Sequence, residues 1–291
     1  MTPMTRTQAP LSADAVAQYR RQGYVVLPGL LSAREIAGCH ADLSGLASGR
    51  IPPGETKLMY EAGIDRGTLA PDAREAAIRK YMDFVPAAPA LRHAAMHRRL
   101  HGALDQLLGT GRVLFQEMAL VKPAHIGSEK PWHQDAAYFR VTDPALIVGV
   151  WIALDPALKE NGCMEVVPGS HLGGAVPHRH ENDFNRCRIL PSHVRADRRV
   201  AVEMQPGDAL LFHSLLHHYT AANASPLRRR AVQFHYHQDG AEWAGVEEHR
   251  RLYHFADGSY AGCTLPHEPA DASAYWYRGA LARPVAVEEG A

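Results

Sequence analysis

The sequence has few of the features that mark membrane, secreted or nucleic-acid-binding proteins. Its 31 basic and 31 acidic residues give a formal net charge of zero, which provides no long-range field for nucleic acid or an anionic membrane. No apolar run approaches the roughly 20 residues that span a bilayer. The segment Met1 to Arg6 lacks the hydrophobic stretch of a signal peptide. We therefore expect a cytoplasmic protein with a small-molecule partner, no nucleic acid and no membrane; the oligomeric state stays open.

Cysteine is also scarce, and its spacing excludes the common cysteine motifs. No two cysteines form the C-x-x-C pair that is typical of a zinc or redox site. Free thiols are the usual state in a reducing compartment, so we predict that all four are free. They are Cys39, Cys163, Cys187 and Cys263.

The order of the local patterns favours one domain. Residues 1–10 are polar and contain proline, so we expect them to be disordered. Residues 11–291 are expected to form a single domain. Within it we assign 11–110 to a helical layer and loop, 111–240 to a β core, and 241–291 to a C-terminal extension.

Helical signals dominate the first part of the domain. Ser12 can cap one helix, which Gly23 would end, and Ser32 with Glu35 forms a capping-box pattern at the start of a second. A Gly- and Pro-containing stretch follows and predicts a long loop. The predicted elements are helices over 13–22, 33–46, 72–82 and 87–108, and a loop over 49–71.

From Val113 onward the pattern changes to short strands separated by turn residues. Helices followed by strands favour a mainly β fold with α. We predict a jelly roll, that is, a cupin-like double-stranded β-helix, with the N-terminal helices packed on one sheet. The irregular, polar segment 172–199 is expected to cover the mouth of the roll. The predicted strands are 113–122, 131–139, 146–154, 163–167, 200–203, 208–213 and 229–237.

Side chains two residues apart on a strand share a face, so each strand can be divided into a packing face and a candidate cavity face. In the strand at 146–154, one face pairs a large ring with small neighbours, as if a space were left open. In the strand at 229–237, one face is polar and the other apolar. The candidate cavity faces are Leu114, Gln116, Met118, Leu120 and Lys122; Ile147, Gly149, Trp151 and Ala153; and Arg229, Ala231, Gln233, His235 and His237.

A candidate metal site follows from the same rule. His133 and Asp135 lie two residues apart and can hold one ion from one side. A second histidine would complete a set of two histidines and one carboxylate, which is typical of non-haem Fe(II) oxygenases and leaves positions open for cosubstrate and oxygen. Two histidines compete for this place, and we favour His218 over His213 because of its spacing to the polar turn and arginines that follow.

An arginine completes the expected chemistry. An iron oxygenase that uses a 2-oxo acid must hold the far carboxylate of that acid, and a planar guanidinium does so with two parallel hydrogen bonds. Arg229 points to the cavity face of its strand, whereas Arg228 and Arg230 are interpreted as solvated charges.

With these residues in place, the chain resembles the phytanoyl-CoA dioxygenase family of Fe(II)/2-oxoglutarate-dependent oxygenases, from about Tyr19 to Tyr236. The ordered set of motifs is more specific than His-x-Asp alone. One departure is Tyr219, where the family usually has glycine. The motifs are Gly23–Gly29, Trp132–Asp135, Asn161–Cys163, Pro168–His171, Pro206–Asp208 and His218–Asn223, followed by Arg229.

The resemblance implies roles for individual residues. His133, Asp135 and His218 match the iron ligands, and Arg229 matches the residue that pairs with the distal carboxylate of 2-oxoglutarate. Further contacts to the cosubstrate are implied by the resemblance at Lys80, Met118, Gln134, Trp151 and Thr220.

The implied activity is hydroxylation of a small organic substrate with Fe(II), 2-oxoglutarate and O2, releasing succinate and CO2. The same site could instead serve desaturation, cyclisation or epimerisation of a natural product, and the sequence does not decide between these. A non-catalytic jelly-roll binding protein and a zinc or manganese isomerase are the alternatives from other classes. Asp135 argues against a halogenase, since related halogenases have a small residue there.

Specificity is expected to come from segments without a regular pattern, because loops around a rigid scaffold commonly carry binding groups. These segments are 49–71, 172–199 and 243–277. Their basic residues would suit an anionic substrate such as a carboxylate or an acyl thioester. The residues singled out are Lys57, Tyr60, Arg186, Arg188, Trp243, Tyr260 and Trp276.

Overall fold

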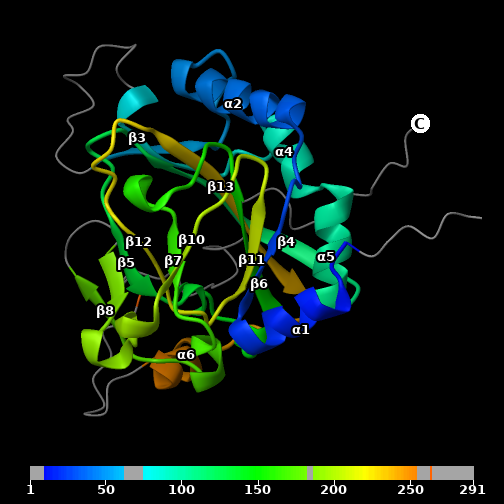
Figure 1. The fold of residues 1–291 in the computed structure, drawn as a ribbon. Helices are drawn as coiled ribbons and strands as arrows, with labels where there is room; N and C mark the ends of the chain where they lie inside the picture. The colour runs from blue at the N-terminus through cyan, green and yellow to red at the C-terminus, as the bar shows by residue number, and fades with distance from the viewer. Residues whose placement is uncertain (1–9, 62–74, 182–185, 254–262, 264–291) are drawn as a thin grey trace, which may run out of the picture.

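The computed structural model describes residues 10–61, 75–181, 186–253 and 263. Two antiparallel sheets face each other and form the predicted jelly roll (Figure 1). The larger sheet has the strand order β1-β11-β6-β13-β4-β3-β2, and the smaller has the order β10-β7-β12-β5. The strands are β1 (Tyr24–Leu27), β2 (Lys57–Tyr60), β3 (Ile78–Met82), β4 (Arg112–Lys122), β5 (Lys130–His133), β6 (Ile147–Ala153), β7 (Met164–Val166), β10 (Val200–Val202), β11 (Ala209–His213), β12 (His218–Thr220) and β13 (Arg229–Gln238).

Helices cover the outer face of the larger sheet, as the sequence predicted (Figure 1). Leu43, Leu91 and Leu104 from this layer share a buried cluster with Val150 of β6 and Phe234 of β13. Burial of this apolar surface is a main stabilising contribution to the fold. The helices of this layer are α1 (Ala13–Gln22), α2 (Ala33–Ser48), α4 (Pro89–Ala95) and α5 (Arg98–Leu108). A further helix, α6 (Val246–Tyr253), belongs to a different apolar cluster.

The ends of α1 and α2 form for local reasons that the sequence already contains. Ser32 and Glu35 make the reciprocal hydrogen bonds of a capping box at the start of α2. Gly23 ends α1 with a φ of 83°, a left-handed conformation that glycine adopts without a Cβ clash. The prediction of both helices is confirmed.

The prediction for 49–82 was wrong in two places. Part of the expected loop forms β2. Of the helix expected at 72–82, residues 75–77 are helical, but Ile78–Met82 forms β3. Pairing of β3 with β2 and β4 extends the larger sheet, and these tertiary contacts override the helix-forming preference of Arg79, Lys80 and Met82.

A separate two-stranded sheet lies beside the smaller sheet (Figure 1). The polar segment expected to be irregular contains β8 (His178–Glu181) and β9 (Arg186–Ile189), which pair with each other. The strand predicted over 131–139 is shorter than expected, because β5 ends at His133 and a 3-10 helix begins at Asp135.

A separate apolar cluster fills part of the space between the two sheets. It joins Trp151 and Phe212 of the larger sheet to Met164 and Val166 of the smaller one. The Phe212 ring occupies the position that a Cβ on Gly149 would need. The space that the small residue leaves on β6 is therefore filled by Phe212.

None of the helices in the described ranges is long and apolar enough to span a bilayer. Residues 1–9 lie outside the described ranges, so the disorder expected at 1–10 stays a prediction. Tyr260 and Trp276 also lie outside these ranges. That 11–291 forms one domain stays a prediction.

Candidate active site

The two histidines of the candidate metal site face each other across neighbouring strands. His218 of β12 is the direct cross-strand partner of His133 of β5, and their ring centroids are 4.0 Å apart. Asp135 follows after one extended residue, and its Oδ1 lies 3.4 Å from Nε2 of His133 and 3.5 Å from Nε2 of His218. All three side chains are buried, and one ligand atom from each lies within 4.8 Å of the other two.

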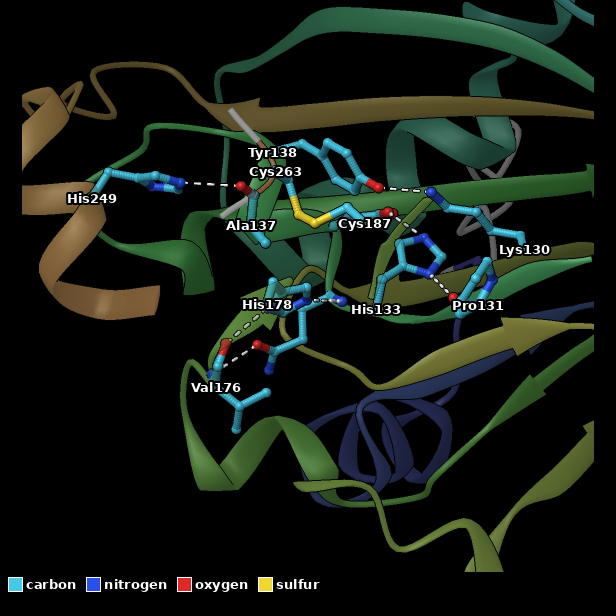
Figure 2. The surroundings of a disulfide bond; sticks show 12 residues. Lys130, Pro131, His133, Ala137, Tyr138, Val176, His178, Cys187, His249 and Cys263 are labelled. Carbon is cyan, nitrogen blue, oxygen red and sulfur yellow. Dashed lines mark hydrogen bonds and ion pairs between the residues drawn. A yellow bond between two sulfur atoms is a disulfide. The ribbon is translucent and has the colours of Figure 1, made fainter. Parts of the chain in front are cut away.

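Backbone carbonyls fix which nitrogen of each ring faces the centre. Nδ1 of His133 donates to the carbonyl of Pro131 at 2.7 Å, as Figure 2 shows, and Nδ1 of His218 donates to the carbonyl of Leu216 at 2.9 Å. With Nδ1 protonated, the Nε2 lone pairs point toward Asp135 and are available to a metal. Burial and the neighbouring His218 hold the pKa of His133 well below its usual value, so this ring is neutral.

The carboxylate of Asp135 is held from its other side. His235 Nε2 donates to Asp135 Oδ2 at 2.8 Å, and the Gln233 amide donates to the same oxygen at 3.2 Å. Burial alone would raise the pKa of Asp135, but His218 and His235 hold it well below the usual value. The carboxylate is therefore ionised, with Oδ2 restrained and Oδ1 directed to the histidines.

The sequence did not predict that Gln233 and His235 hold the carboxylate of Asp135. Strand parity placed both on the cavity face with Arg229, and that was the signal available in the sequence. The contact of His235 with Asp135 spans 100 residues, so local sequence could not reveal it.

The segment that carries Asp135 is braced by the hairpin β8–β9 and by α6. His178 Nε2 accepts from the backbone N–H of Gln134 at 3.0 Å, while its Nδ1 donates to the carbonyl of Val176 at 2.8 Å. His249 of α6 bonds the carbonyl of Ala137 at 3.1 Å, as Figure 2 also shows. These contacts fix the backbone on both sides of the carboxylate.

A disulfide lies beside this segment and corrects the cysteine prediction. Cys187 of β9 is bonded to Cys263, with Cα atoms 5.3 Å apart and a sequence separation of 76 residues (Figure 2). Spacing alone could not show that the hairpin brings these two together. Cys39 and Cys163 are free and buried, as predicted.

A cavity of about 160 Å³ opens beside the three residues, between the two sheets. Five of the six residues expected to contact the cosubstrate line it. They are Lys80, Met118, Trp151, Thr220 and Arg229.

Gln134 is the exception, because its side chain does not line the cavity. Its amide donates to the carbonyls of Gly174 and Leu215, and its oxygen accepts from the N–H of Val176. Gln134 lies between His133 and Asp135 on extended backbone, so its side chain points to the opposite side.

Arg229 lies buried in the cavity wall with part of its hydrogen-bonding capacity unused. Its side chain is 2% exposed, Nη1 donates to the carbonyl of Leu120 at 3.3 Å, and the guanidinium lies 5.1 Å from the ring of Trp151. Within the described part of the chain, Nε of Arg229 and Nε1 of Trp151 have no hydrogen-bond partner. Burial lowers the pKa of Arg229 to about 10, which leaves it charged at neutral pH.

These unused donors fit the cosubstrate. A buried charge without a counter-charge is costly, and the distal carboxylate of 2-oxoglutarate would supply one. The donor set of two histidines and a carboxylate fits Fe(II) with positions left open. The residues present therefore match both groups.

The start of β13, and with it Arg229, is held by a buried amide. Asn223 donates to the carbonyls of Lys122, Pro123 and Leu227. This ties the loop before β13 to the end of β4, and gives a physical reason for the asparagine that follows the distal histidine.

Two further residues that the sequence singled out, His213 and Tyr219, lie away from the cavity. His213 lies apart from the three-residue group: its ring is 4.9 Å from that of His171, and its Nδ1 accepts from the N–H of Leu215. The Tyr219 hydroxyl bonds Glu129 and its ring stacks on Trp132 at 5.3 Å, so it faces away from the cavity.

The expected specificity residues that the structure describes do not line the cavity. Lys57 is exposed and ion-paired with Asp83 at 2.7 Å, and Trp243 packs against Phe115 and His237. Tyr60 packs against the helix-covered core, and neither it nor Arg188 lines the cavity. The side chain of Arg186 lies outside the described part.

Comparison with known proteins agrees with this site. The model of the phytanoyl-CoA dioxygenase (PhyH) family matches residues 19–231. A probable phytanoyl-CoA dioxygenase of Caenorhabditis elegans is 27% identical over 246 residues, covering 81% of this chain and 78% of that protein.

Solved structures agree as well. The non-haem α-ketoglutarate-dependent carbocyclase SnoK from nogalamycin biosynthesis is 26% identical, with a TM-score of 0.63, covering 82% of this chain and 88% of its own. The epimerase SnoN from the same biosynthesis is 25% identical, with a TM-score of 0.58, covering 89% and 90%.

The fold and the site together define a non-haem iron and 2-oxoglutarate-dependent oxygenase. Its cofactors are iron and 2-oxoglutarate. The chain belongs to the phytanoyl-CoA dioxygenase family.

Proposed function

We propose that this enzyme hydroxylates a small organic substrate, with His133, Asp135 and His218 as iron ligands and Arg229 as the partner of the distal carboxylate of 2-oxoglutarate. The observation that carries the proposal is the shared cavity. A three-residue metal-binding group and a buried guanidinium, whose Nε has no hydrogen-bond partner among the described residues, line the same cavity. An acid that chelates the metal at one end would meet the guanidinium at the other.

When bound, Fe(II) and 2-oxoglutarate supply the oxidation of the substrate by O2, with release of succinate and CO2. The protein positions these groups and excludes water. His133 and His218 present their Nε2 atoms, Asp135 presents Oδ1, and Gln233 and His235 keep that carboxylate from turning. No side chain needs to act as a nucleophile.

Four other residues of the cavity wall support the cosubstrate in this proposal. Lys80 adds positive charge, Thr220 offers a hydroxyl, and Trp151 offers an N–H that has no hydrogen-bond partner in the described ranges. Met118 contributes apolar wall. The Trp151 ring also lies against the guanidinium of Arg229, which restricts the rotamers that this side chain can adopt.

A second candidate is desaturation, cyclisation or epimerisation of a natural product, favoured by the similarity to SnoK and SnoN. Product mass separates the outcomes. Hydroxylation adds one oxygen atom, desaturation or oxidative cyclisation removes two hydrogen atoms, and epimerisation leaves the mass unchanged.

The class of activity is tested by measuring succinate formed from 2-oxoglutarate, with Fe(II), O2 and a substrate panel. We expect wild-type protein to form succinate and Asp135→Ala to form none above background, while both show the same far-UV circular dichroism. Equal succinate from the two proteins would show that Asp135 is not an iron ligand.

A further inference from the structure

The cavity wall carries more positive charge than iron and 2-oxoglutarate require. The charges of Fe(II) and of the 2-oxoglutarate dianion cancel, so the charges of the protein set the balance. Among the described lining residues the only carboxylate is Asp135. The basic lining residues are Arg79, Lys80, Lys122, Lys130 and Arg229, and burial holds the pKa of Lys122 well below its usual value.

A β-bulge brings two of these cations to the same cavity. Met59 of β2 is paired with Lys80 of β3, and the next residue, Tyr60, is paired with Ile78. Arg79 is therefore the extra residue of the bulge. Regular alternation would send Arg79 and Lys80 to opposite faces, whereas a bulge re-aims a side chain, and both residues line the cavity.

The bulged cation is not neutralised within the described part of the chain. Arg79 and Lys80 form no hydrogen bond or ion pair there through their side chains, and the nearby Asp83 is ion-paired with Lys57 instead. Burial and the charge of Arg79 lower the pKa of Lys80 to about 8. Burial and the charges of Lys80 and Arg79 lower the pKa of Lys130 to about 7. The cations are crowded together, and an anion between them would relieve the repulsion.

Lys130 is oriented by a phenol that can itself donate. Its Nζ donates to the hydroxyl oxygen of Tyr138 at 2.6 Å (Figure 2). Burial raises the pKa of Tyr138, so the hydroxyl keeps its proton. Lys130 and Tyr138 both line the cavity, and each can donate to one anionic group.

We propose that Arg79, Lys130 and Tyr138 form a subsite for the carboxylate of the prime substrate, which is accordingly a small organic acid. This inference rests on the proposed function, because it assigns Arg229 and Lys80 to 2-oxoglutarate and leaves Arg79 and Lys130 for the substrate. The planar guanidinium of Arg79 suits a carboxylate, which it can bind with two parallel hydrogen bonds. Specificity for an acid is then set on the inner wall and not by Lys57 on the outside.

The test uses aliphatic and aromatic monocarboxylic acids, each beside its own primary amide, titrated calorimetrically under argon into full-length protein loaded with Fe(II) and 2-oxoglutarate. We expect the best acid to bind about 10-fold or more tightly than its amide, as one charge-assisted hydrogen bond would give. Arg79→Gln should bring that ratio to about one, and Arg79→Lys should retain part of it. The matched control Lys57→Gln should keep the wild-type ratio.

The proposal is overturned if no acid binds wild-type protein more tightly than its amide, or if Arg79→Gln keeps the wild-type ratio. It is also overturned if Arg79→Gln weakens 2-oxoglutarate as much as it weakens the acid, since Arg79 would then belong to the cosubstrate. Failure of the proposed function looks different. In that case wild-type protein would not bind 2-oxoglutarate in the presence of Fe(II), which the loading titration measures before any acid is added.

Discussion

The two faces of β13 show how one strand serves both the fold and the site. Val232, Phe234 and Tyr236 on the outer face pack into the helix-covered core. Arg229, Gln233 and His235 on the inner face line the cavity. Both faces are buried, but the outer one buries apolar surface and stabilises the fold, whereas the inner one buries a charge and polar groups at a cost in stability. The difference predicts that substitutions on the two faces affect different measurements.

The largest effect is expected within the metal-binding group. His218→Ala should lower turnover by roughly a thousandfold or more, because the metal supplies most of the catalysis, while the melting temperature of the metal-free protein changes little. Iron content after anaerobic loading and succinate formation are the measurements. His213→Ala is the matched control and should stay loaded and active; the reverse pattern would identify His213 as the ligand.

A substitution on the outer face of β13 should lower the stability of the protein. Phe234→Ala removes a side chain that is 0% exposed and should lower the free energy of unfolding by about 3–5 kcal/mol. Chemical denaturation measures this. Folded Phe234→Ala should keep the 2-oxoglutarate affinity of wild type. A large loss of affinity in the folded variant would show that the two faces are not separable.

A substitution on the inner face of β13 should weaken the binding of 2-oxoglutarate. Arg229→Gln should raise the KM for 2-oxoglutarate about 10- to 100-fold, because it removes hydrogen bonds to a charged group. The unfolding free energy of the unliganded protein should stay the same or rise, since an uncompensated buried charge is removed. A strongly destabilised Arg229→Gln protein with an unchanged KM would assign Arg229 a structural role.

A smaller, pH-dependent effect comes from a carboxyl group near the outer face. Burial raises the pKa of Glu117 on β4 from its usual 4.5 to about 7, and its side chain accepts from the N–H of Val85. The folded state therefore holds more protons than the unfolded state between these two values, so stability falls as pH rises through this window and is level above it.

Glu117→Gln should remove this dependence and stabilise the protein at pH 8 by roughly 3 kcal/mol, since one pKa unit corresponds to about 1.4 kcal/mol. Denaturation at pH 5 and pH 8 is the measurement. If the free energies of unfolding of Glu117→Gln and wild type differ by the same amount at pH 5 and at pH 8, the pKa of Glu117 is not shifted.

The sequence predicted the roll and the group of His133, Asp135 and His218, because both depend on local patterns. Alternation on β6 and β13 gave the correct faces for Trp151 and Arg229. The same rule failed at Leu114, which packs in the helix-covered core, because the pairing of β4 with β13 shifts by one residue between His235 and Tyr236.

What local patterns could not supply was pairing over long distances. The segment at 78–82 has helix-forming residues, but neighbouring strands draw it into the sheet as β3. The bond between Cys187 and Cys263 likewise depends on where the hairpin β8–β9 lies. Bulges and long-range contacts set the details of the cavity wall, Arg79 included.

The most direct test of the account is an anaerobic titration of Fe(II)-loaded protein with 2-oxoglutarate, followed by the visible charge-transfer band of the chelated complex. The account predicts the band in wild type, its loss in His218→Ala at any concentration of 2-oxoglutarate, and its return in Arg229→Gln only at about 10- to 100-fold higher concentration. A band in His218→Ala at wild-type concentrations, or no band in iron-loaded wild type, would contradict it.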